Sequence, residues 1–292
     1  EWAVKNQVEF FVFEYEKLKE ALEFAKKYDT AAIIHIEVET GMNRTGFTQK
    51  DLHKVVKLIS ENKSYFRVKG LCTHYAGAES IANHVRVQRQ IKKYNRIYKW
   101  ITNRGINPEL RHTACSAAAM TYPKTRMDMV RVGILQYGFW PSPETFIHFV
   151  HKRMEKSDPL QRVLSWKSQV MSIKTIHPGE FVSYGNYYMA QEEKVIAIVP
   201  VGYSHGYSRS LSNQGRVLID GHRVPVIGIV NMNMLIADVT HIEDVKKGDE
   251  VVLIGDQDGV TITLASFADF NNQLNYELLA RLPLNTPRKV IN

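Results

Sequence analysis

The sequence predicts an α/β fold with an added β domain, namely part of a (β/α)8 barrel of the TIM type followed by an antiparallel β domain. In residues 1–150, strand-like apolar runs alternate with helix-like segments, which is typical of parallel strands joined by crossover helices. In residues 151–292, short apolar runs are separated by Gly, Asn and Asp turns, which is typical of antiparallel strands. Only about five strands can be counted in the first half, whereas a closed barrel of this type has eight. We therefore expect the C-terminal part of a barrel.

The first expected strand covers residues 8–13 (VEFFVF), and a helix rich in Glu, Lys, Leu and Ala follows as far as Tyr28. The second strand, residues 31–38 (AAIIHIEV), alternates apolar and polar residues near its end, and a helix follows over roughly residues 50–62.

A third strand at residues 66–74 (FRVKGLCTH) leads into a long helix that ends near Arg104. A short strand at residues 110–114 (LRHTA) precedes a small helix at 116–120 (SAAAM), and residues 127–134 (MDMVRVGI) are expected to form the last strand of this half.

The second half is expected to begin near residues 145–160, where the texture of the sequence changes, so that the two domains are 1–150 and 151–292. Its expected strands are VMSIKTI (170–176), KVIAIVPVGY (194–203), GRVLIDG (215–221), HRVPVIGIV (222–230), LIADVT (235–240) and DEVVLIG (249–255).

The composition is that of a soluble globular protein, with 44% hydrophobic and 23% charged residues in 292 positions. No apolar run approaches the roughly 18 residues that a membrane span needs, and no signal-peptide pattern opens the chain. Cys72 and Cys115 lie far apart and show no metal-ligand spacing, so we expect no metal site and a cytoplasmic protein.

The net charge of +8 raises the possibility of a nucleic-acid partner. However, the basic residues are scattered, and the densest run, residues 86–100, has the spacing of a solvated helix face. We expect neither a nucleic-acid nor a membrane partner, whereas a phosphorylated small molecule would suit a basic protein.

Polar residues recur at the C-terminal ends of the expected parallel strands, where active sites of such barrels form. One of them, Arg44, lies in a turn that Gly41 and Gly46 bracket. Taken singly, a histidine at a strand end, a serine at a helix start and a glycine in a turn each have a structural explanation. Their recurrence at one end of successive strands favours a site, and its candidates are Arg44, His74, His112, Ser116, Arg131 and Gly133.

Ser116 at a helix start and the amides of Gly133 and Ile134 would offer neutral hydrogen-bond donors to a phosphate group. This signal is weaker than a P-loop, and no GxxxxGK[ST] motif occurs.

Several motifs follow one another in an informative order: HIEVETGMNRTGF, GLCTHYAGAES, HTACSAA, RVGILQYG, VMSIKTIHPGEFVSYG, IAIVPVGYSHGYSR, VIGIVNMNMLIADVT, GDEVVLIG and NYELLARLPLNTPR. In this order and spacing, from about residue 8 onward, the chain resembles the alanine racemase family. The resemblance implies a pyridoxal 5'-phosphate enzyme with an N-terminal (β/α)8 barrel and a C-terminal β domain.

The family's first barrel strands and its K-x-N-A-Y-G-H-G segment, which carries the Schiff-base lysine, have no counterpart here. Lys5 in WAVKNQ does not match that segment. We therefore expect the chain as given to be a fragment that is inactive without this lysine.

The resemblance implies that Tyr184 of VSYG is a catalytic residue that removes or returns the α-proton on the face opposite the lysine. A phenol is a poor base at neutral pH, so cationic or hydrogen-bonding neighbours must favour its anion, and His74 is implied in that role. Arg44 is implied to reach the phenolic oxygen of the cofactor and the substrate carboxylate.

By the same resemblance, Arg131 is the partner of the pyridine nitrogen, with His112 behind it. Arginine keeps its proton, so the cofactor becomes a weaker electron sink, which limits side reactions such as transamination. The implied phosphate ligands are Ser116, Gly133, Ile134 and Tyr276.

Tyr203 resembles the family's tyrosine at the substrate entrance, and the Met232 amide is implied to donate to the substrate carboxylate. His205 and Asn233 stand where the family commonly has aspartates, so strict specificity for alanine is less firmly implied.

Many family members have a carbamylated lysine at the position of Glu37. We expect the permanent carboxylate of Glu37 to replace the carbamate and to hold Arg44 in a bidentate ion pair. The alternative is that Glu37 points outward into solvent.

The expected function is racemisation of L- and D-alanine by two bases, which supplies D-alanine for peptidoglycan. The enzyme is expected to bind a small amino-acid substrate and to form a head-to-tail homodimer. Two alternatives stay open: a racemase of broad specificity or for the basic amino acids lysine and ornithine, and a catalytically inactive binding or regulatory module.

Overall fold

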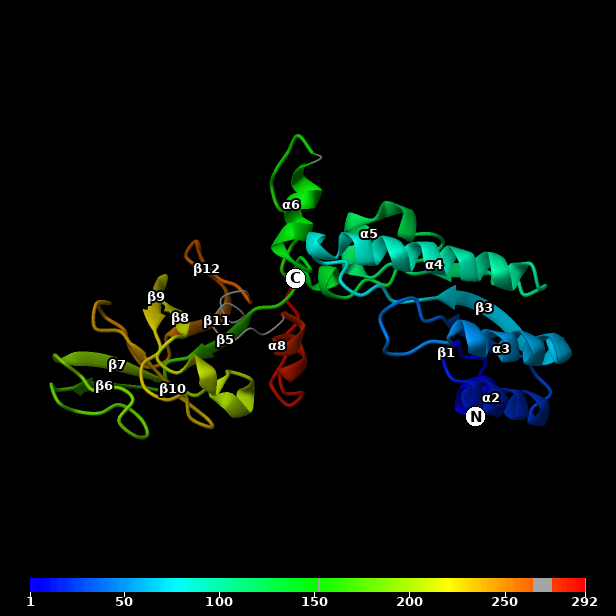
Figure 1. Cartoon of the computed structure of the whole chain (residues 1–292). Coiled ribbons are helices and arrows are strands. Elements are labelled where there is room, and N and C mark those ends of the chain that lie inside the picture. The colour runs from blue at the N-terminus through cyan, green and yellow to red at the C-terminus, as the bar shows by residue number, and fades with distance from the viewer. Residues whose placement is uncertain (152, 265–274, 292) are drawn as a thin grey trace. The chain divides into compact units, whose positions relative to one another are not determined.

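A computed structural model describes residues 1–151, 153–264 and 275–291, with the backbone only for Asn275 and Tyr276. The chain forms two compact units, Glu1–Leu160 and Gln161–Asn292, and each is described by itself (Figure 1).

The first unit is built on a parallel sheet with the strand order β1-β2-β3-β4. Each strand is followed by a helix, as the alternating pattern predicts. The strands are β1 (Phe10–Val12), β2 (Ala32–Glu37), β3 (Phe66–Cys72) and β4 (Leu110–His112), and the helices are α1 (Trp2–Lys5), α2 (Tyr15–Lys27), α3 (Gln49–Glu61), α4 (His84–Thr102), α5 (Ser116–Thr121) and α6 (Pro143–His151).

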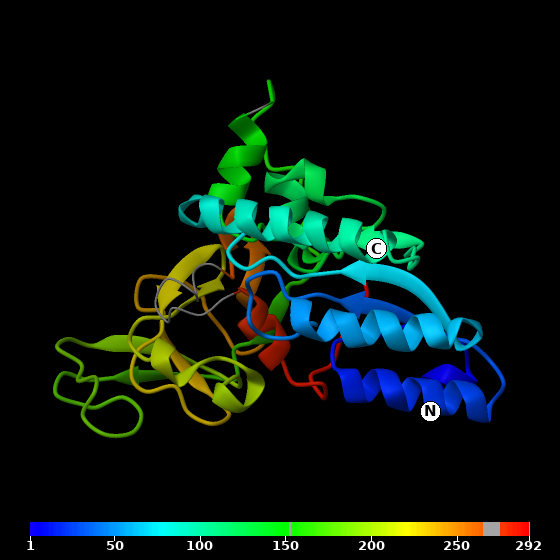
Figure 2. The same cartoon turned by 45° about the vertical axis from the view of Figure 1, so that its right-hand side comes forward.

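Helices α2, α3 and α4 run side by side along the sheet (Figures 1 and 2). Each has an apolar stripe with helical spacing, such as Leu52, Val55, Val56 and Ile59 in α3, and these side chains are buried in one core with the strands. Thr48 caps α3 by accepting a hydrogen bond from the Asp51 amide, which fixes where this helix begins.

The two faces of β2 have different roles because successive side chains point to opposite faces of a strand. Ala32, Ile34 and Ile36 are packed in the core that includes the helices. His35 and Glu37 therefore point to the other face, which in a barrel of this type is the interior.

The expected strand at residues 127–134 is wrong. Only Arg131 pairs there, in a single parallel bridge with Cys115. Met127 has a φ of 48°, which interrupts an extended chain, and the Asp128 carboxylate takes the amide of Arg111 at 2.8 Å in place of a strand partner. The Asp128 side chain and two backbone bonds, from the Asp128 amide to the Arg111 carbonyl and from the Arg131 amide to the Ala114 carbonyl, thus hold the segment as a loop.

The second unit consists of antiparallel strands, as predicted. One sheet has the order β10-β7-β6, and the other has the order β12-β11-β8-β9 with β5 also paired to β11. The strands are β5 (Trp166–Gln169), β6 (Ser172–Ile176), β7 (Lys194–Val199), β8 (Arg216–Ile219), β9 (His222–Pro225), β10 (Leu235–Asp238), β11 (Glu250–Gln257) and β12 (Val260–Ile262), and α8 covers Asn275–Arg281.

The sequence analysis does not predict β5 and β12. Both are short, and β5 (WKSQ) carries one large apolar residue, Trp166, so neither has a pattern long enough to be read. Among the described helices, none combines the length and the apolar character that crossing a membrane requires.

Candidate active site

Arg131 is held in place at the C-terminal edge of the parallel sheet by three hydrogen bonds. Its Nη1 donates to Nδ1 of His112 at 2.6 Å and to the His112 carbonyl oxygen at 2.7 Å, and its Nη2 donates to the Thr73 carbonyl oxygen at 2.7 Å. Within the described part of the chain, these bonds use three of the five N–H groups of the guanidinium, and the other two remain for a ligand.

His112 is fully buried, and this burial is the main cause that lowers its pKa to about 3. The positive charge of Arg131 and the neighbouring His35 lower the pKa further. The imidazole is therefore neutral at physiological pH, so it accepts the hydrogen bond of Arg131 without adding a second positive charge.

His74 follows β3 and lies near both cationic site candidates of this unit. Its pKa is lowered first by burial and then by the positive charges of Arg131 and Arg44. His74 can therefore serve as a neutral hydrogen-bonding group rather than as a cation.

Ser116 and Gly133 meet although they lie 17 positions apart, because the Gly133 amide donates to Oγ of Ser116 at 2.9 Å. Ser116 is the first residue of α5, whose N-cap is Cys115, so the serine does not have the capping role that was its structural alternative. Since its oxygen accepts from Gly133, the Ser116 hydroxyl proton can be donated to a ligand.

The expected ion pair between Glu37 and Arg44 is wrong for the described part of the chain, where neither side chain forms a salt bridge. The Glu37 carboxylate instead accepts a hydrogen bond from the Thr45 hydroxyl at 3.0 Å, and Arg44 is exposed. The turn is organised by Glu39, whose carboxylate accepts from the amides of Gly41 and Asn43. The physical reason is local, because the turn is closed by bonds from the Gly41 and Asn43 amides to Glu39, and in this turn Thr45 rather than Arg44 reaches the Glu37 carboxylate.

This geometry predicts that Glu37→Gln is mild, because a glutamine oxygen can still accept from Thr45. We expect the free energy of unfolding to fall by about 1 kcal/mol or less, and racemisation to be independent of bicarbonate. The matched control is Glu39→Gln, which leaves one backbone amide without its acceptor and should cost about 1–3 kcal/mol. Urea denaturation of both variants tests the order, and a larger loss in Glu37→Gln would contradict it.

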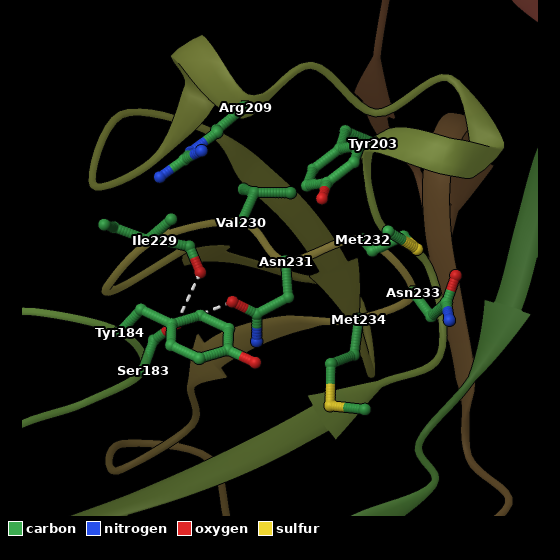
Figure 3. A pocket seen from close by; sticks show the side chains of 10 residues that line it. All are labelled: Ser183, Tyr184, Tyr203, Arg209, Ile229, Val230, Asn231, Met232, Asn233 and Met234. Atoms are coloured by element: carbon green, nitrogen blue, oxygen red, sulfur yellow. Dashed lines mark hydrogen bonds between the residues drawn. The ribbon is translucent and has the colours of Figure 1, made fainter.

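The second unit contains a pocket of about 510 Å3 (Figure 3). Three of its lining residues, Tyr184, Tyr203 and Met232, are site residues predicted from three separate motifs. The complete lining is Ser183, Tyr184, Tyr203, Arg209, Ile229, Val230, Asn231, Met232, Asn233 and Met234.

Ser183 fixes the segment that presents Tyr184. Its hydroxyl lies 2.7 Å from the Ile229 carbonyl oxygen and 2.9 Å from Oδ1 of Asn231, and its backbone has a φ of 67°. This conformation turns the chain so that the Tyr184 ring lies over the pocket (Figure 3), where 72% of the residue is exposed.

The segment of Tyr203 is tied to the opposite wall. The Tyr203 amide donates to the Asn231 carbonyl and the Ser204 amide to the Met232 carbonyl, each at 3.0 Å. Gly202 allows this close approach, because a Cβ there would overlap the Asn231 carbonyl oxygen.

His205 caps the turn that carries Tyr203. Its Nδ1 accepts a hydrogen bond from the Gly202 amide at 3.2 Å, which an aspartate oxygen would do equally. The turn is thus capped by a side chain that carries no carboxylate.

The comparisons with known proteins agree across both units. Residues 1–141 match the family described as "Alanine racemase, N-terminal domain", and residues 163–290 match "Alanine racemase, C-terminal domain". The alanine racemase of Clostridium perfringens (strain SM101 / Type A) is 37% identical over 287 residues, which cover 98% of this chain and 72% of that protein. The chain belongs to the alanine racemase family.

Solved alanine racemases have the same fold. The protein from Streptomyces coelicolor A3(2) superimposes with a TM-score of 0.89 at 29% identity, over 98% of this chain and 73% of that one. The Bartonella henselae protein, solved with covalently bound pyridoxal phosphate, gives a TM-score of 0.81 at 25% identity, over 96% and 72%. The prediction of part of a TIM barrel followed by a β domain is confirmed.

As an alanine racemase relative, the chain carries its site candidates in two groups. The first unit contains Arg44, His74, His112, Ser116, Arg131, Gly133 and Ile134, and the second contains Tyr184, Tyr203 and Met232. Tyr276 lies in α8, but its side chain is outside the described residues.

Sequence reasoning missed Ser183, Asn231 and Arg209 of the pocket. Each belongs to a quoted motif, VSYG, VNMNM or GYSHGYSR, so their position beside a predicted site residue was the available signal. Nothing in the sequence marked Thr73, because its contribution is a backbone carbonyl.

Proposed function

We infer that this chain, together with the lysine segment that the family carries, performs the alanine racemase reaction, the interconversion of L- and D-alanine. The observation that carries the inference is family membership over both units, together with the pocket in which Tyr184, Tyr203 and Met232 come together. The proposed cellular role is the supply of D-alanine for peptidoglycan in the cytoplasm.

The residues of the first unit fit pyridoxal phosphate. Arg131 is fixed with N–H donors left for a ring nitrogen, and the buried Ser116 hydroxyl, whose oxygen accepts from the Gly133 amide, can donate its proton to a phosphate. Gly133, Ile134 and Tyr276 are further proposed phosphate ligands. When bound, the cofactor supplies an electron sink that makes the α-proton of an amino acid acidic.

In the proposed mechanism, Tyr184 Oη takes the α-proton from one enantiomer and returns it to form that enantiomer in the reverse direction. His74 supports the phenol by a hydrogen bond, since the lowered pKa of its imidazole favours the neutral ring. Arg44 and the Met232 amide bind the substrate carboxylate, which fixes the α-carbon relative to the base.

We propose that the working enzyme is a head-to-tail homodimer. Tyr184 is 72% exposed in a single chain, whereas a proton-transfer group works best where bulk water is excluded. A partner subunit that covers this face would provide the exclusion and would bring Tyr184 to the barrel of the other chain.

The test of cofactor binding uses the protein extended at its N-terminus to include the lysine segment. We expect it to retain pyridoxal phosphate after borohydride reduction and to equilibrate L- and D-alanine. An extended protein that binds no cofactor would refute the proposal.

The pocket favours a neutral amino acid over lysine or ornithine. Arg209 is the one charged residue among the ten described lining residues, and a cationic substrate side chain would meet this positive charge without a carboxylate to pair with. We expect kcat/KM for alanine to exceed that for lysine by at least about 100-fold.

Asn233→Asp is the companion variant, because an aspartate can keep the acceptor that Ser204 Oγ uses at 2.8 Å while it adds a negative charge. Amino-acid profiling should show a higher kcat/KM for lysine in this variant than in the wild type. A wild-type enzyme that prefers lysine would instead favour the basic amino-acid racemase.

A further inference from the structure

A chain of four side chains runs from Arg131 across the sheet to the protein surface. Beyond the bond from Arg131 to His112, Nε2 of His112 lies 2.7 Å from Nδ1 of His35, and Nε2 of His35 lies 2.9 Å from a carboxylate oxygen of Glu9. Both imidazoles are buried, with exposed fractions of 0% for His112 and 5% for His35. Glu9 is the one exposed member of the chain.

The direction of every hydrogen bond in this chain follows from the arginine. A guanidinium cannot accept, so Nδ1 of His112 accepts from Arg131 and the proton of the neutral ring is on Nε2. That proton is donated to Nδ1 of His35, whose own proton is therefore on Nε2 and is donated to Glu9. The burial that lowers the pKa of His112 is consistent with a neutral ring.

The backbone is shaped to permit this contact. His35 is on β2 and His112 on β4, so their bond spans the intervening strand β3. The β3 residue between them is Gly70, where a Cβ would overlap Nδ1 of His35 and lie 2.8 Å from Nε2 of His112. A shift in the pairing of β2 with β3, between Ile34 and His35, brings Gly70 to this position.

Phe11 covers the pair. Its ring centroid is 5.5 Å from that of His35 and 5.8 Å from that of His112. An apolar cover keeps water from competing for the imidazole nitrogens, and in such surroundings successive hydrogen bonds polarise one another.

We propose that Glu9 and His35 are positioning residues that act through His112 to hold the Arg131 guanidinium at the cofactor ring nitrogen. The proposal rests on the proposed function only for the identity of the ligand. The Glu9 carboxylate draws the His35 proton, which makes His35 a better acceptor for His112, and Nδ1 of His112 in turn becomes a better acceptor for Arg131. Arg131 is thereby kept from rotating away when no ligand is bound.

The first test is NMR of the full-length protein, labelled at Arg and His and free of cofactor. In the wild type we expect both imidazoles as the Nε2–H tautomer and separate signals for the two Nη groups of Arg131, because rotation is restricted. Glu9→Leu and Gly70→Ala should broaden or merge the Arg131 signals, and Glu9→Gln should restore part of the separation, since an amide oxygen still accepts from His35.

The matched control is Glu109→Leu. Glu109 directly precedes β4, pairs with Arg67 and Lys69 and does not contact either histidine. Since Lys69 also lies 4.0 Å from the Glu9 carboxylate, this variant separates loss of the Lys69 ion pairs from loss of the bond between Glu9 and His35. Glu109→Leu should leave the Arg131 signals unchanged. Glu9→Leu changes an exposed position, so it should fold even if Gly70→Ala does not.

The second measurement is the dissociation constant of pyridoxal phosphate in the extended protein. We expect it to rise about tenfold in Glu9→Leu and to stay unchanged in Glu109→Leu. If the wild type binds no cofactor, the proposed function fails while the NMR result still decides the hydrogen-bond chain. Arg131 signals that are identical in wild type and Glu9→Leu would overturn the inference.

Discussion

Tyr184→Phe should abolish net racemisation in both directions and leave cofactor binding intact. Removing one positioned base typically lowers a rate by about 100- to 10,000-fold. The phenol oxygen is the atom that is lost, and the phenyl ring keeps its place over the pocket because Ser183, not the hydroxyl of Tyr184, fixes the segment.

A two-base mechanism gives this variant a distinctive signature. Exchange of the α-proton with deuterated solvent should persist for the enantiomer that the other base serves and should be lost for the enantiomer that Tyr184 serves. Proton NMR of each alanine enantiomer in D2O measures both rates, and equal rates near those of the wild type would show that another residue is the base.

Tyr187→Phe is the control. Tyr187 is three positions away and 71% exposed, much as Tyr184 is, but it does not line the pocket. Its variant should retain wild-type activity. Loss of cofactor absorbance in Tyr184→Phe would indicate a structural role for Tyr184.

Arg131→Met should weaken both the fold and cofactor binding. The substitution leaves Nδ1 of His112 and two carbonyl oxygens without their donor. Buried acceptors that lose a partner cost about 1–3 kcal/mol each, so we expect the free energy of unfolding to fall by on the order of 3 kcal/mol. The dissociation constant of pyridoxal phosphate should rise by about 10- to 100-fold.

Arg67→Met separates this effect from the loss of any arginine. Arg67 is on β3 of the same sheet, and its guanidinium pairs with the exposed carboxylate of Glu109 at 2.6 Å. An exposed pair contributes about 0–1 kcal/mol, so stability and cofactor affinity should hardly change. Denaturant titration and fluorescence titration with the cofactor test both variants, and equal losses in the two would contradict the role of Arg131.

The parts of the fold that the sequence predicted well are those with local physical causes. Helix α3 is bounded by a threonine cap and carries an apolar stripe, so its range could be predicted to within about one residue. The antiparallel strands of the second unit follow short apolar runs between turn residues in the same way.

Both errors arise where an acidic side chain binds backbone amides. Residues 127–134 have the apolar content of a strand, but the Asp128 side chain occupies the Arg111 amide and prevents regular pairing. The hydrogen-bond partner of Glu37 could not be predicted from the sequence either. Whether Thr45 or Arg44 reaches the Glu37 carboxylate depends on how Glu39 closes the turn.

The hydrogen-bond chain behind Arg131 was beyond sequence reasoning for a third reason. His35 and His112 are 77 positions apart, and their contact requires both a particular strand register and a glycine between them. Spacing along one strand carries no information about either condition.

The close seating of Gly202 against the Asn231 carbonyl has a dynamic consequence. Since the amides of Tyr203 and Ser204 are bonded to the carbonyls of Asn231 and Met232, residues 202–205 and 231–232 must open as one cooperative piece. Hydrogen exchange at Tyr203 and Ser204 should then share a single opening free energy. Access to the pocket would be governed by rotation of the Tyr203 ring about its side-chain bonds, a motion on the picosecond-to-nanosecond scale for an exposed side chain, rather than by slower displacement of the loop.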